Sequence, residues 1–441
     1  MAIHVMDEAK LCLGCPKPRC QEGCPIRTDI PNVIKLLKAG DLDAAGWKLF
    51  ENNPLTTVCA LVCNHEKQCE GHCVRGIKGS PVHFSVIESY ISTTFANKMV
   101  KGPATPNGMK AAVVGSGPAG LTIAVLLARK GYDVTIFEAR NRIGGMMRYG
   151  IPNFRLPDAV LDDFQYRHLE LKNIKVRPNT TIGKTITIDD LFRDGFKSVF
   201  IGAGLWKANA MHIRGESLGN VAFGIDYLAN PGGFKSLGGD IAVIGVGNSA
   251  MDCARTAIRN GARHVTCYGR KSESDVSASS YEVSYAKLEG VDFRFGLLPV
   301  ELRSDGVVFR ENRRNEDGSW TPVEGSEKLY PHTGVIVSVS QSSSYEVDTG
   351  SDGSCAMTRS AKGLLSVDDH GATTRPGVFA GGDAVAGART VVEAVAGAKK
   401  VAEAMDEYMQ SLPKGGDDDP YGDVPVVAGP KPDALAEQHV G

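Results

Sequence analysis

Eight of the eleven cysteines in this chain lie close together near its N-terminus, and they constrain its fold more than any other feature. They form two groups, which read Cys12-x2-Cys15-x4-Cys20-x3-Cys24 and Cys59-x3-Cys63-x5-Cys69-x3-Cys73. Between them the sequence offers short helical pieces, such as IPNVIKLLKAGD, and little strand pattern. We therefore expect residues 1–105 to form a helical domain that bound metal helps to hold together.

Three kinds of cross-link could use these thiols. Disulfides suit a small secreted domain, but the N-terminus has no basic segment followed by an apolar run, so we expect a cytoplasmic protein with reduced thiols. Zinc is an alternative, because Cys-x2-Cys pairs build tetrahedral zinc sites. Two 4Fe-4S clusters are favoured, since in two-cluster ferredoxins the last cysteine of such a run, here Cys24 before Pro25, ligates the other cluster.

Length and charge limit the classes of partner. A chain of 441 residues exceeds what one hydrophobic core supports, which predicts several domains. It has 49 basic and 51 acidic residues, a net charge of -2, and so offers no electrostatic case for binding nucleic acid or an anionic membrane. No segment approaches the ~18 apolar residues of a membrane span. We expect small molecules and proteins as partners, with no nucleic acid and no membrane insertion.

A strand, a glycine-rich turn, an apolar helix and a second strand follow a breaker-rich linker at residues 103–108. The turn reads Gly115-x-Gly117-x-x-Gly120, and Glu138 ends the second strand. In a βαβ unit such glycines permit a tight turn and the close approach of a pyrophosphate, while the carboxylate accepts a hydrogen bond from a ribose hydroxyl. The segment is therefore predicted to bind a dinucleotide.

The same pattern recurs further along the chain as Gly245-x-Gly247-x-x-Ala250, after the strand DIAVI. The next strand is followed by Arg270 and Lys271 instead of a carboxylate. Two cations suit a 2′-phosphate, which favours NADP(H) over NAD(H), although NAD(H) is possible and a solvated basic turn is the alternative. Two dinucleotide sites also favour clusters over zinc, because such a chain has a use for one-electron carriers.

Features near the C-terminus are less specific. Gly382 and Asp383 follow a short apolar strand, where Asp383 could hold a flavin ribityl hydroxyl, and an ordinary turn is the alternative. The acidic, Pro- and Gly-rich residues 413–441 are expected to be a disordered extension or a strap over a partner subunit. The late cysteines show no ligand spacing and are interpreted as structural; they are Cys253, Cys267 and Cys355.

Taken together, these motifs resemble the small (beta) subunit of bacterial glutamate synthase over roughly residues 5–410. The resemblance is carried by CLGCPKPRCQEGCP, ENNPL, CEGHCVRGIKGSPV, VGSGPAGL, GGMMRYGIPNFRLP and GDAVAGARTVVEA. Related proteins are the N-terminal half of dihydropyrimidine dehydrogenase and the large subunit of NADH-dependent ferredoxin:NADP oxidoreductase. The resemblance implies an α/β fold like that of adrenodoxin reductase, in which two Rossmann-like dinucleotide-binding domains, one inserted in the other, follow the helical iron-sulfur domain.

The resemblance also implies which residues hold each cofactor. The first cluster would take Cys12, Cys15, Cys20 and Cys73, and the second would take Cys24, Cys63, Cys69 and Glu88. Cys59 would then be unligated, and an exposed helix carboxylate is the alternative for Glu88. FAD would be held by Gly115, Gly117, Gly120, Glu138, Gly145, Arg148, Gly382, Asp383 and Val392. The nicotinamide nucleotide would be held by Gly245, Gly247, Asn248, Arg270 and Lys271.

Two segments depart from the family's pattern. The usual I-G-Q reads Val339-Ser340-Gln341, and the usual Met-Pro-Ala reads Val276-Ser277-Ala278. Because Ser340 stands where the family has glycine, we expect the backbone to approach the nucleotide differently there.

The expected domains are the cluster domain at 1–105, a first FAD-binding part at 108–235, an NAD(P)H-binding domain at 236–345, a second FAD-binding part at 346–412 and the tail. The resemblance implies an electron-transfer flavoprotein subunit that passes electrons between NADPH or NADH, FAD and two 4Fe-4S clusters, to or from a partner catalytic subunit. Hydride transfer would occur at FAD without a catalytic protein base. The alternatives are a self-contained oxidoreductase of an organic substrate and a non-catalytic nucleotide-binding module.

Overall fold

The computed structural model describes residues 4–96, 105–169, 173–343 and 357–413. Nearly all of the expected tail and Cys355 lie outside these residues. The chain divides into two compact units, which are described separately. The first comprises Met1–Asn97, Gly144–Asp163 and Gly204–Ser344, and the second comprises Lys98–Ile143, Phe164–Ala203 and Tyr345–Gly441. The domain boundaries expected from the sequence stay predictions.

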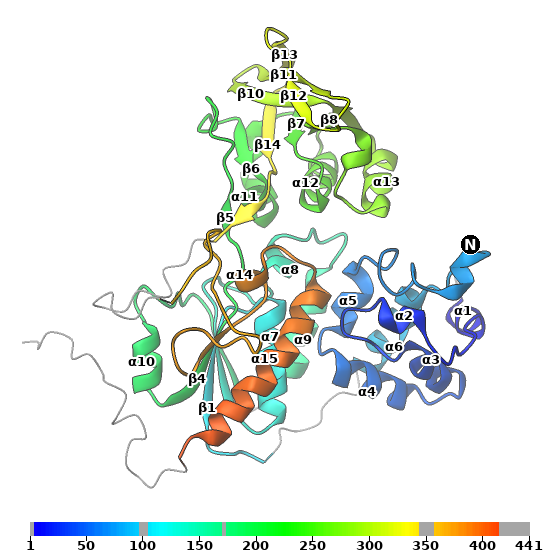
Figure 1. Cartoon of the computed structure of the whole chain (residues 1–441), viewed down its shortest axis with the longest axis vertical. Coiled ribbons are helices and arrows are strands. Elements are labelled where there is room, and N and C mark those ends of the chain that lie inside the picture. The colour runs from blue at the N-terminus through cyan, green and yellow to red at the C-terminus, as the bar shows by residue number, and fades with distance from the viewer. Residues whose placement is uncertain (1–3, 97–104, 170–172, 344–356, 414–441) are drawn as a thin grey trace, which may run out of the picture. The chain divides into compact units, whose positions relative to one another are not determined.

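Short helices form the N-terminal part of the first unit (Figure 1, blue). Their apolar residues follow helical spacing: α3 buries Ile30, Val33, Ile34 and Leu37 on one face. The Oδ1 atom of Asp41 accepts a hydrogen bond from the amide of Ala44 at 3.0 Å and caps α4. The elements are α1 (Val5–Lys10), α2 (Arg19–Glu22), α3 (Ile30–Lys38), α4 (Leu42–Asn52), α5 (Thr56–Val62), the 3-10 helix η1 (Val74–Ile77) and α6 (Phe84–Ala96).

The core of this helical part is small and includes thiols. Buried Cys69 packs with aliphatic residues of α3, α4 and α6, and the half-buried Cys12, Cys20 and Cys73 lie against the same cluster. Two buried carboxylates hold the chain where α6 begins, because Glu8 accepts a hydrogen bond from the amide of His83 at 2.6 Å and Glu70 one from Ser85 at 2.9 Å. The cysteine loops are therefore packed into the fold and not appended to it.

A five-stranded parallel sheet with the order β6-β14-β7-β8-β9 forms the nucleotide-binding part of the first unit. Strand β7 pairs with β8 and β14, and α12 follows β7 directly. The elements are β6 (Val221–Phe223), α11 (Gly224–Ala229), η3 (Pro231–Gly233), η4 (Lys235–Leu237), β7 (Asp240–Ile244), α12 (Asn248–Arg259), β8 (His264–Gly269), η5 (Glu273–Asp275), α13 (Ser280–Leu288), β9 (Val291–Phe295) and β14 (Gly334–Val337).

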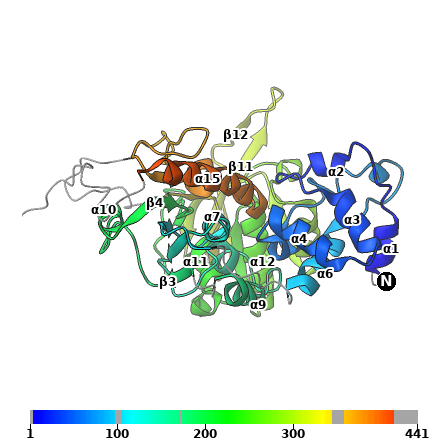
Figure 2. The ribbon, with the colours of Figure 1, turned by 90° about the horizontal axis from the view of Figure 1, so that it is seen from below.

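Two smaller sheets complete this unit. In the antiparallel sheet β10-β11-β12, strand β13 also pairs with β11, and the β11–β12 hairpin projects outward (Figure 2). A two-stranded sheet joins β5 to β15. The elements are α8 (Met146–Tyr149), α9 (Asp158–Phe164), β5 (Lys207–Ala208), β10 (Leu297–Arg303), β11 (Gly306–Arg314), β12 (Trp320–Pro322), β13 (Lys328–Pro331) and β15 (Gln341–Ser342).

The second unit is built on a parallel sheet with the order β16-β4-β1-β2-β3. Helix α15 lies along α7 (Figure 2), and Lys130, just after α7, forms ion pairs with Glu403 and Asp406 of α15 at 2.7 and 2.6 Å. The elements are β1 (Lys110–Val114), α7 (Pro118–Arg129), β2 (Asp133–Phe137), the π-helix η2 (Gln165–Leu169), β3 (Ile174–Arg177), α10 (Ile188–Arg193), β4 (Phe196–Ile201), β16 (Val378–Ala380), α14 (Asp383–Ala386) and α15 (Val391–Ser411).

The order of the strands confirms the predicted insertion. Strand β16 pairs with β4, yet every strand of the nucleotide-binding sheet lies between β4 and β16 in the sequence. One parallel α/β domain is therefore inserted into another, as the two fingerprints and the resemblance implied. Within the described residues, no helix is both long and apolar enough to span a bilayer.

Candidate functional site

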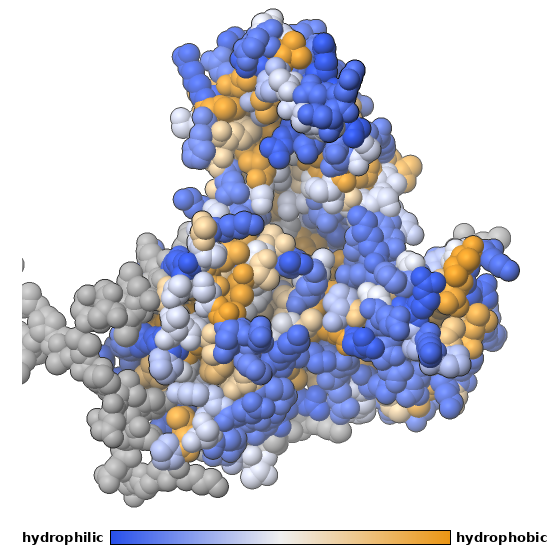
Figure 3. Space-filling model, in the orientation of Figure 1, coloured by the Kyte–Doolittle hydropathy of each residue, from blue (hydrophilic) through white to orange (hydrophobic). Residues whose placement is uncertain are grey.

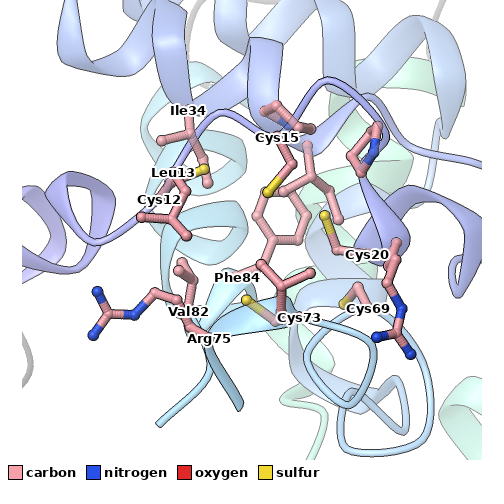
Figure 4. A pocket seen from close by; sticks show the side chains of 15 residues that line it. Cys12, Leu13, Cys15, Cys20, Ile34, Cys69, Cys73, Arg75, Val82 and Phe84 are labelled. Atoms are coloured by element: carbon pink, nitrogen blue, oxygen red, sulfur yellow. The ribbon is translucent and has the colours of Figure 1, made fainter. Parts of the chain in front are cut away.

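The thiols expected to bind the first cluster gather around one cavity. Cys12, Cys15, Cys20 and Cys73 line it, together with Cys69 (Figure 4). Burial and the nearby thiols of Cys73, Cys12 and Cys15 raise the pKa of Cys20 to about 11. The rest of the cavity wall is mostly apolar, with Ile34, Val82 and Phe84 among its residues, and it also includes Arg19 and Arg75. Thiols around a small and mostly apolar cavity are the donors and the surroundings that a 4Fe-4S cluster uses.

Cys69 also has a second group of candidate donors around it. Burial, Glu88, Glu70 and Cys24 all raise the pKa of the Cys69 thiol. The pKa of Cys63 is also raised, by a hydrogen bond with Cys59, by burial and by Glu88 and Cys69. These pKa shifts link Cys69 to Cys24 and Glu88, and Cys63 to Glu88 and Cys69; the ligand set that the resemblance implied stays a prediction. Cys59 lies beside them as well, so proximity alone does not separate Cys59 from Glu88 as the fourth donor.

Glu88 is buried, with 6% of its surface exposed, so the alternative of an exposed helix carboxylate is wrong. Its Oε1 atom accepts a hydrogen bond from the Thr56 hydroxyl at 2.7 Å. Burial raises the pKa of Glu88 to about 7, against the opposing effect of that hydrogen bond. A buried carboxylate without a cation beside it is costly, and a cluster iron would compensate it.

Within the described residues, no three His, Cys, Asp or Glu side chains converge closely enough to hold a single metal ion.

The first glycine fingerprint forms the turn between β1 and α7. Gly115 has a φ of +94°, and a Cβ there would lie 2.6 Å from the carbonyl oxygen of Gly202. A Cβ on Gly120 would lie 2.0 Å from the carbonyl oxygen of Gly115, so this glycine lets α7 pack on the turn. At Gly117, in contrast, a Cβ would meet nothing within 4 Å, which leaves open space where a pyrophosphate would approach.

Two carboxylates flank this turn. Glu138, just after β2, is buried and accepts hydrogen bonds from the amides of Ser116 at 2.9 Å and Arg140 at 2.7 Å. Asp383 begins α14, and its Oδ1 accepts a hydrogen bond from the amide of Arg389 at 3.1 Å. Burial raises the pKa of Asp383 to about 6. The carboxylates would serve as acceptors for ribose and ribityl hydroxyls, which is the role expected from the sequence.

The Gly-Asp motif meets the first fingerprint directly, because a Cβ on Gly382 would lie 3.1 Å from the Cβ of Ala119 in α7. The structure thus brings together two motifs that are far apart in the sequence. Val392, near the start of α15, has a buried side chain, so only its backbone could face a ligand. Gly145 and Arg148 lie at α8 in the other unit, where the Arg148 guanidinium pairs with Asp158 at 3.2 Å and with Asp162 at 2.7 Å.

The second fingerprint repeats this design at the start of α12. Gly245 has a φ of +133°, and a Cβ there would lie 2.2 Å from the carbonyl oxygen of Ser338. At Gly247 the nearest atom to a Cβ would be the Ser277 hydroxyl at 3.5 Å. Asn248 accepts a hydrogen bond through Oδ1 from the amide of Ser279 at 2.9 Å. Asn248 therefore joins the glycine turn to the residue that directly follows the segment Val276-Ser277-Ala278.

The two cations expected at a 2′-phosphate follow the end of β8. Arg270 and Lys271 are both exposed. The carbonyl of Arg270 accepts a hydrogen bond from the side-chain amide of Asn312 at 2.6 Å, and the carbonyl of Lys271 accepts one from the amide of Gly296 at 2.9 Å. The backbone of this turn is thus fixed by the neighbouring sheet, while both positive charges remain open to a ligand.

Ser340 keeps the backbone conformation that glycine would favour. Its φ is +82°, in the left-handed region that costs an L-residue roughly 1–2 kcal/mol. Its carbonyl accepts a hydrogen bond from the amide of Asn209 at 3.2 Å, at the end of the β5–β15 pair. The expectation of a different backbone approach at this position is not supported by the local conformation.

A buried ion network in the first unit was not foreseen from the sequence. Arg155, in the motif GGMMRYGIPNFRLP, contacts Asp252 of α12 at 2.7 Å and Glu282 of α13 at 2.9 Å. Arg255 pairs with Glu282 at 2.7 Å as well. Beside it, Glu66 in the loop between Cys63 and Cys69 accepts hydrogen bonds from the amide and hydroxyl of Ser280 at 3.0 and 2.5 Å. No sequence signal could separate these residues from ordinary surface charges.

Comparisons with known proteins agree with this geometry. A family model described as dihydropyrimidine dehydrogenase domain II, 4Fe-4S cluster, matches residues 2–100, and one described as pyridine nucleotide-disulphide oxidoreductase matches residues 109–399. The structure of Mycobacterium tuberculosis FprA in complex with NADPH has 17% sequence identity and a TM-score of 0.57, and covers 69% of this chain and 85% of that chain. Fold and site together define an NAD(P)H-dependent oxidoreductase with FAD and 4Fe-4S clusters.

Proteins with similar sequences show to which family of these oxidoreductases the chain belongs. The glutamate synthase [NADPH] small chain of Azospirillum brasilense is 32% identical over 417 residues, which are 88% of this chain and 86% of that protein. The chain belongs to the family of this small chain. The NADP(+)-dependent formate dehydrogenase subunit beta of Moorella thermoacetica is 33% identical over 431 residues, which are 89% of this chain but only 60% of that longer protein. Both relatives are named as parts of multi-subunit enzymes.

Proposed function

We propose that this chain is the electron-transfer subunit of a larger enzyme, which exchanges electrons between NADPH and a partner catalytic subunit in the manner of a glutamate synthase small chain. When bound, FAD supplies the step that converts a two-electron hydride into single electrons, which the clusters carry. The protein's part is to bind and orient these groups and to exclude water from them.

The observation that carries the proposal is the clustering of donors in the N-terminal helices. Cys12, Cys15, Cys20 and Cys73 surround one cavity, and a second group of donors adjoins it through Cys69. A nucleotide oxidoreductase that transferred only hydride would have no use for these thiols. One-electron carriers beside two dinucleotide turns favour a chain that delivers electrons elsewhere.

We also propose the ligand sets that the resemblance implied, with Glu88 and not Cys59 as the fourth donor of the second cluster. Glu88 is a buried carboxylate held by Thr56, and its charge has no cation among the causes of its pKa shift. A carboxylate is a harder donor than a thiolate, so the second cluster should differ in potential from the first.

Metal and sulfide analysis combined with two matched variants tests this assignment. The purified chain should hold about eight irons, about eight sulfides and one FAD. Glu88→Ala should leave the flavin and the first cluster in place while the second becomes labile or shifts its potential. Cys59→Ala is the control and should keep both clusters. Zinc without acid-labile sulfide would contradict the clusters, and loss of a cluster in Cys59→Ala alone would contradict the role of Glu88.

The nucleotide is proposed to be NADPH, bound with its 2′-phosphate beside Arg270 and Lys271. Both cations are exposed on a turn whose backbone is fixed by Asn312 and Gly296. The double change of the two cations to Ala should reduce the preference for NADPH over NADH by at least roughly 10- to 100-fold, since the loss of even one charge-assisted hydrogen bond costs ~1.5–3 kcal/mol. Anaerobic flavin bleaching by each nucleotide measures this. Equal use of both nucleotides by the unaltered chain would show that Arg270 and Lys271 do not bind the 2′-phosphate.

A cytoplasmic location is part of the proposal, because none of the ten described cysteines forms a disulfide and reduced thiols suit that compartment.

A further inference from the structure

We propose that the surface over Cys12, Cys15, Cys20 and Cys73 is the docking site for a one-electron carrier protein or subunit whose contact face is acidic. The inference rests on the proposed function and adds to it which cluster faces the partner and what chemistry selects that partner.

The first cluster site is the more accessible of the two. All four of its cysteines are half-buried, whereas two of the four proposed donors of the second site, Cys69 and Glu88, are buried and the other two are half-buried. A groove of about 560 Å³ opens beside the first site, between the Cys12–Cys15 loop and the outer face of α3. Electron transfer falls off steeply with distance, so a partner gains most by approaching here.

The charges around this site are one-sided. The two cavities at the first site have four cations in their walls, Arg19, Lys35, Lys38 and Arg75, and a single anion, Asp29. Asp29 already pairs with Lys48 at 3.0 Å. Within the described residues, no carboxylate forms an ion pair with any of the four cations. The chain as a whole carries a net charge of -2, so this positive surface is local.

An apolar residue shares the walls of the two cavities with these cations. Leu13, between Cys12 and Cys15, has 67% of its surface exposed and lines both cavities. In Figure 3 hydrophilic residues cover most of the N-terminal helices, at the right, with an apolar patch along their upper edge. An apolar centre with a charged rim is the usual anatomy of a protein interface.

Charge complementarity indicates which kind of protein binds to this surface. An acidic face would neutralise the four cations and be steered to the groove over long distances. A second copy of this chain, meeting the site with the same surface, would place like charges against each other, which opposes a symmetric dimer.

Electron transfer to two carriers of opposite charge tests the inference. The chain is reduced with NADPH under anaerobic conditions and mixed with an acidic 2Fe-2S ferredoxin or with basic cytochrome c, over a range of salt concentrations. The variant Lys35→Glu/Lys38→Glu is compared with the control Lys235→Glu/Lys362→Glu, which makes the same change in charge at exposed lysines elsewhere.

The unaltered chain should transfer electrons to ferredoxin faster than to cytochrome c at low salt, and the preference should fade as salt rises. The Lys35/Lys38 variant should lose roughly tenfold or more of the ferredoxin rate at low salt, while the control loses less than about twofold. Reduction of the flavin by NADPH should be the same in all three proteins. Failure of that first step would refute the proposed function, whereas normal flavin reduction without a preference for ferredoxin would refute only the docking site.

Two further measurements address the other possible occupants. Sedimentation of the holoprotein should give the same oligomeric state before and after Lys35→Glu/Lys38→Glu. A dimer that the unaltered chain forms and the variant does not would show that a second copy of the chain, and not a carrier protein, binds to this surface. Binding to vesicles of phosphatidylserine and phosphatidylcholine that Lys35→Glu/Lys38→Glu abolishes would assign the surface to a membrane and overturn the inference.

Discussion

Replacing Arg155 by Met should open the contact between the GGMMRYGIPNFRLP segment and the nucleotide-binding helix. Arg155 contacts Asp252 at 2.7 Å and Glu282 at 2.9 Å, and the side chains of Asp252 and Glu282 are only 5% and 13% exposed. Methionine keeps much of the volume of arginine but none of its charge, so two buried carboxylates would lose a cation. Glu282 retains Arg255 at 2.7 Å, whereas Asp252 would be left without a cation at comparable distance.

The expected cost follows from that arrangement. Removing one member of a buried ion pair costs about 3–5 kcal/mol, mostly because the remaining charge is uncompensated. Burial raises the pKa of Asp252 to about 7 even with Arg155 beside it, and without the cation that pKa should rise further. A carboxyl whose folded pKa is raised makes stability fall between its unfolded pKa of about 4 and that raised pKa, so a further rise adds to the loss only above about pH 7. The destabilisation by Arg155→Met should therefore be small at pH 6 and grow above pH 7.

Hydrogen exchange of the amides in α12 and α13 measures this locally, which avoids assuming that a chain of several domains unfolds in one step. Arg259→Met is the control, because Arg259 pairs with Glu289 at 2.7 Å but is 48% exposed, and it should cost less than ~1 kcal/mol. The double variant Arg155→Met/Asp252→Asn should recover much of the lost protection. Equal protection in Arg155→Met and Arg259→Met at pH 8 would refute the reasoning.

Two other changes have expected effects on stability. Ser340→Gly should raise the free energy of unfolding by about 0.5 kcal/mol, because relief of left-handed strain of ~1–2 kcal/mol exceeds the added chain entropy of ~0.5–1 kcal/mol. Thermal unfolding measures this change, with Ser342→Gly as the control. A lowered Tm of Ser340→Gly would contradict the expectation. In flavin-stripped protein, Asp383 with its pKa raised to about 6 should make stability fall as pH rises from about 4 to 6, by up to about 3 kcal/mol. Asp383→Asn should remove that slope, and an unchanged pH profile would show that Asp383 is not the titrating group.

The parts of the fold that could be predicted from the sequence are those with a local physical signature. The turns at Gly115 and Gly245 need positive φ and close backbone contact, and both needs leave glycine at a regular spacing after an apolar strand. The alternation of such strands and helices also predicted the inserted α/β arrangement, which the strand order confirms. Glu88, in contrast, could not be distinguished by spacing from a surface carboxylate, because its burial depends on α5 and on Thr56.

The contacts that join the site-bearing segments to one another leave no such signature, because each of their residues is ordinary in its own local sequence. Glu66 stands in a loop of polar residues, Ser280 follows a serine-rich stretch, and Arg155 lies between an aromatic residue and a leucine. In the structure, Glu66 anchors the loop between Cys63 and Cys69 to the first residue of α13, and Arg155 anchors the motif that contains Arg148 to α12 and α13. Asn248, at the start of α12, binds the residue just before Ser280. The start of α13 thus receives contacts from three segments of the chain, through Glu66, Arg155 and Asn248. Each of these residues is ordinary in its local sequence, so only the folded backbone determines that they make these contacts.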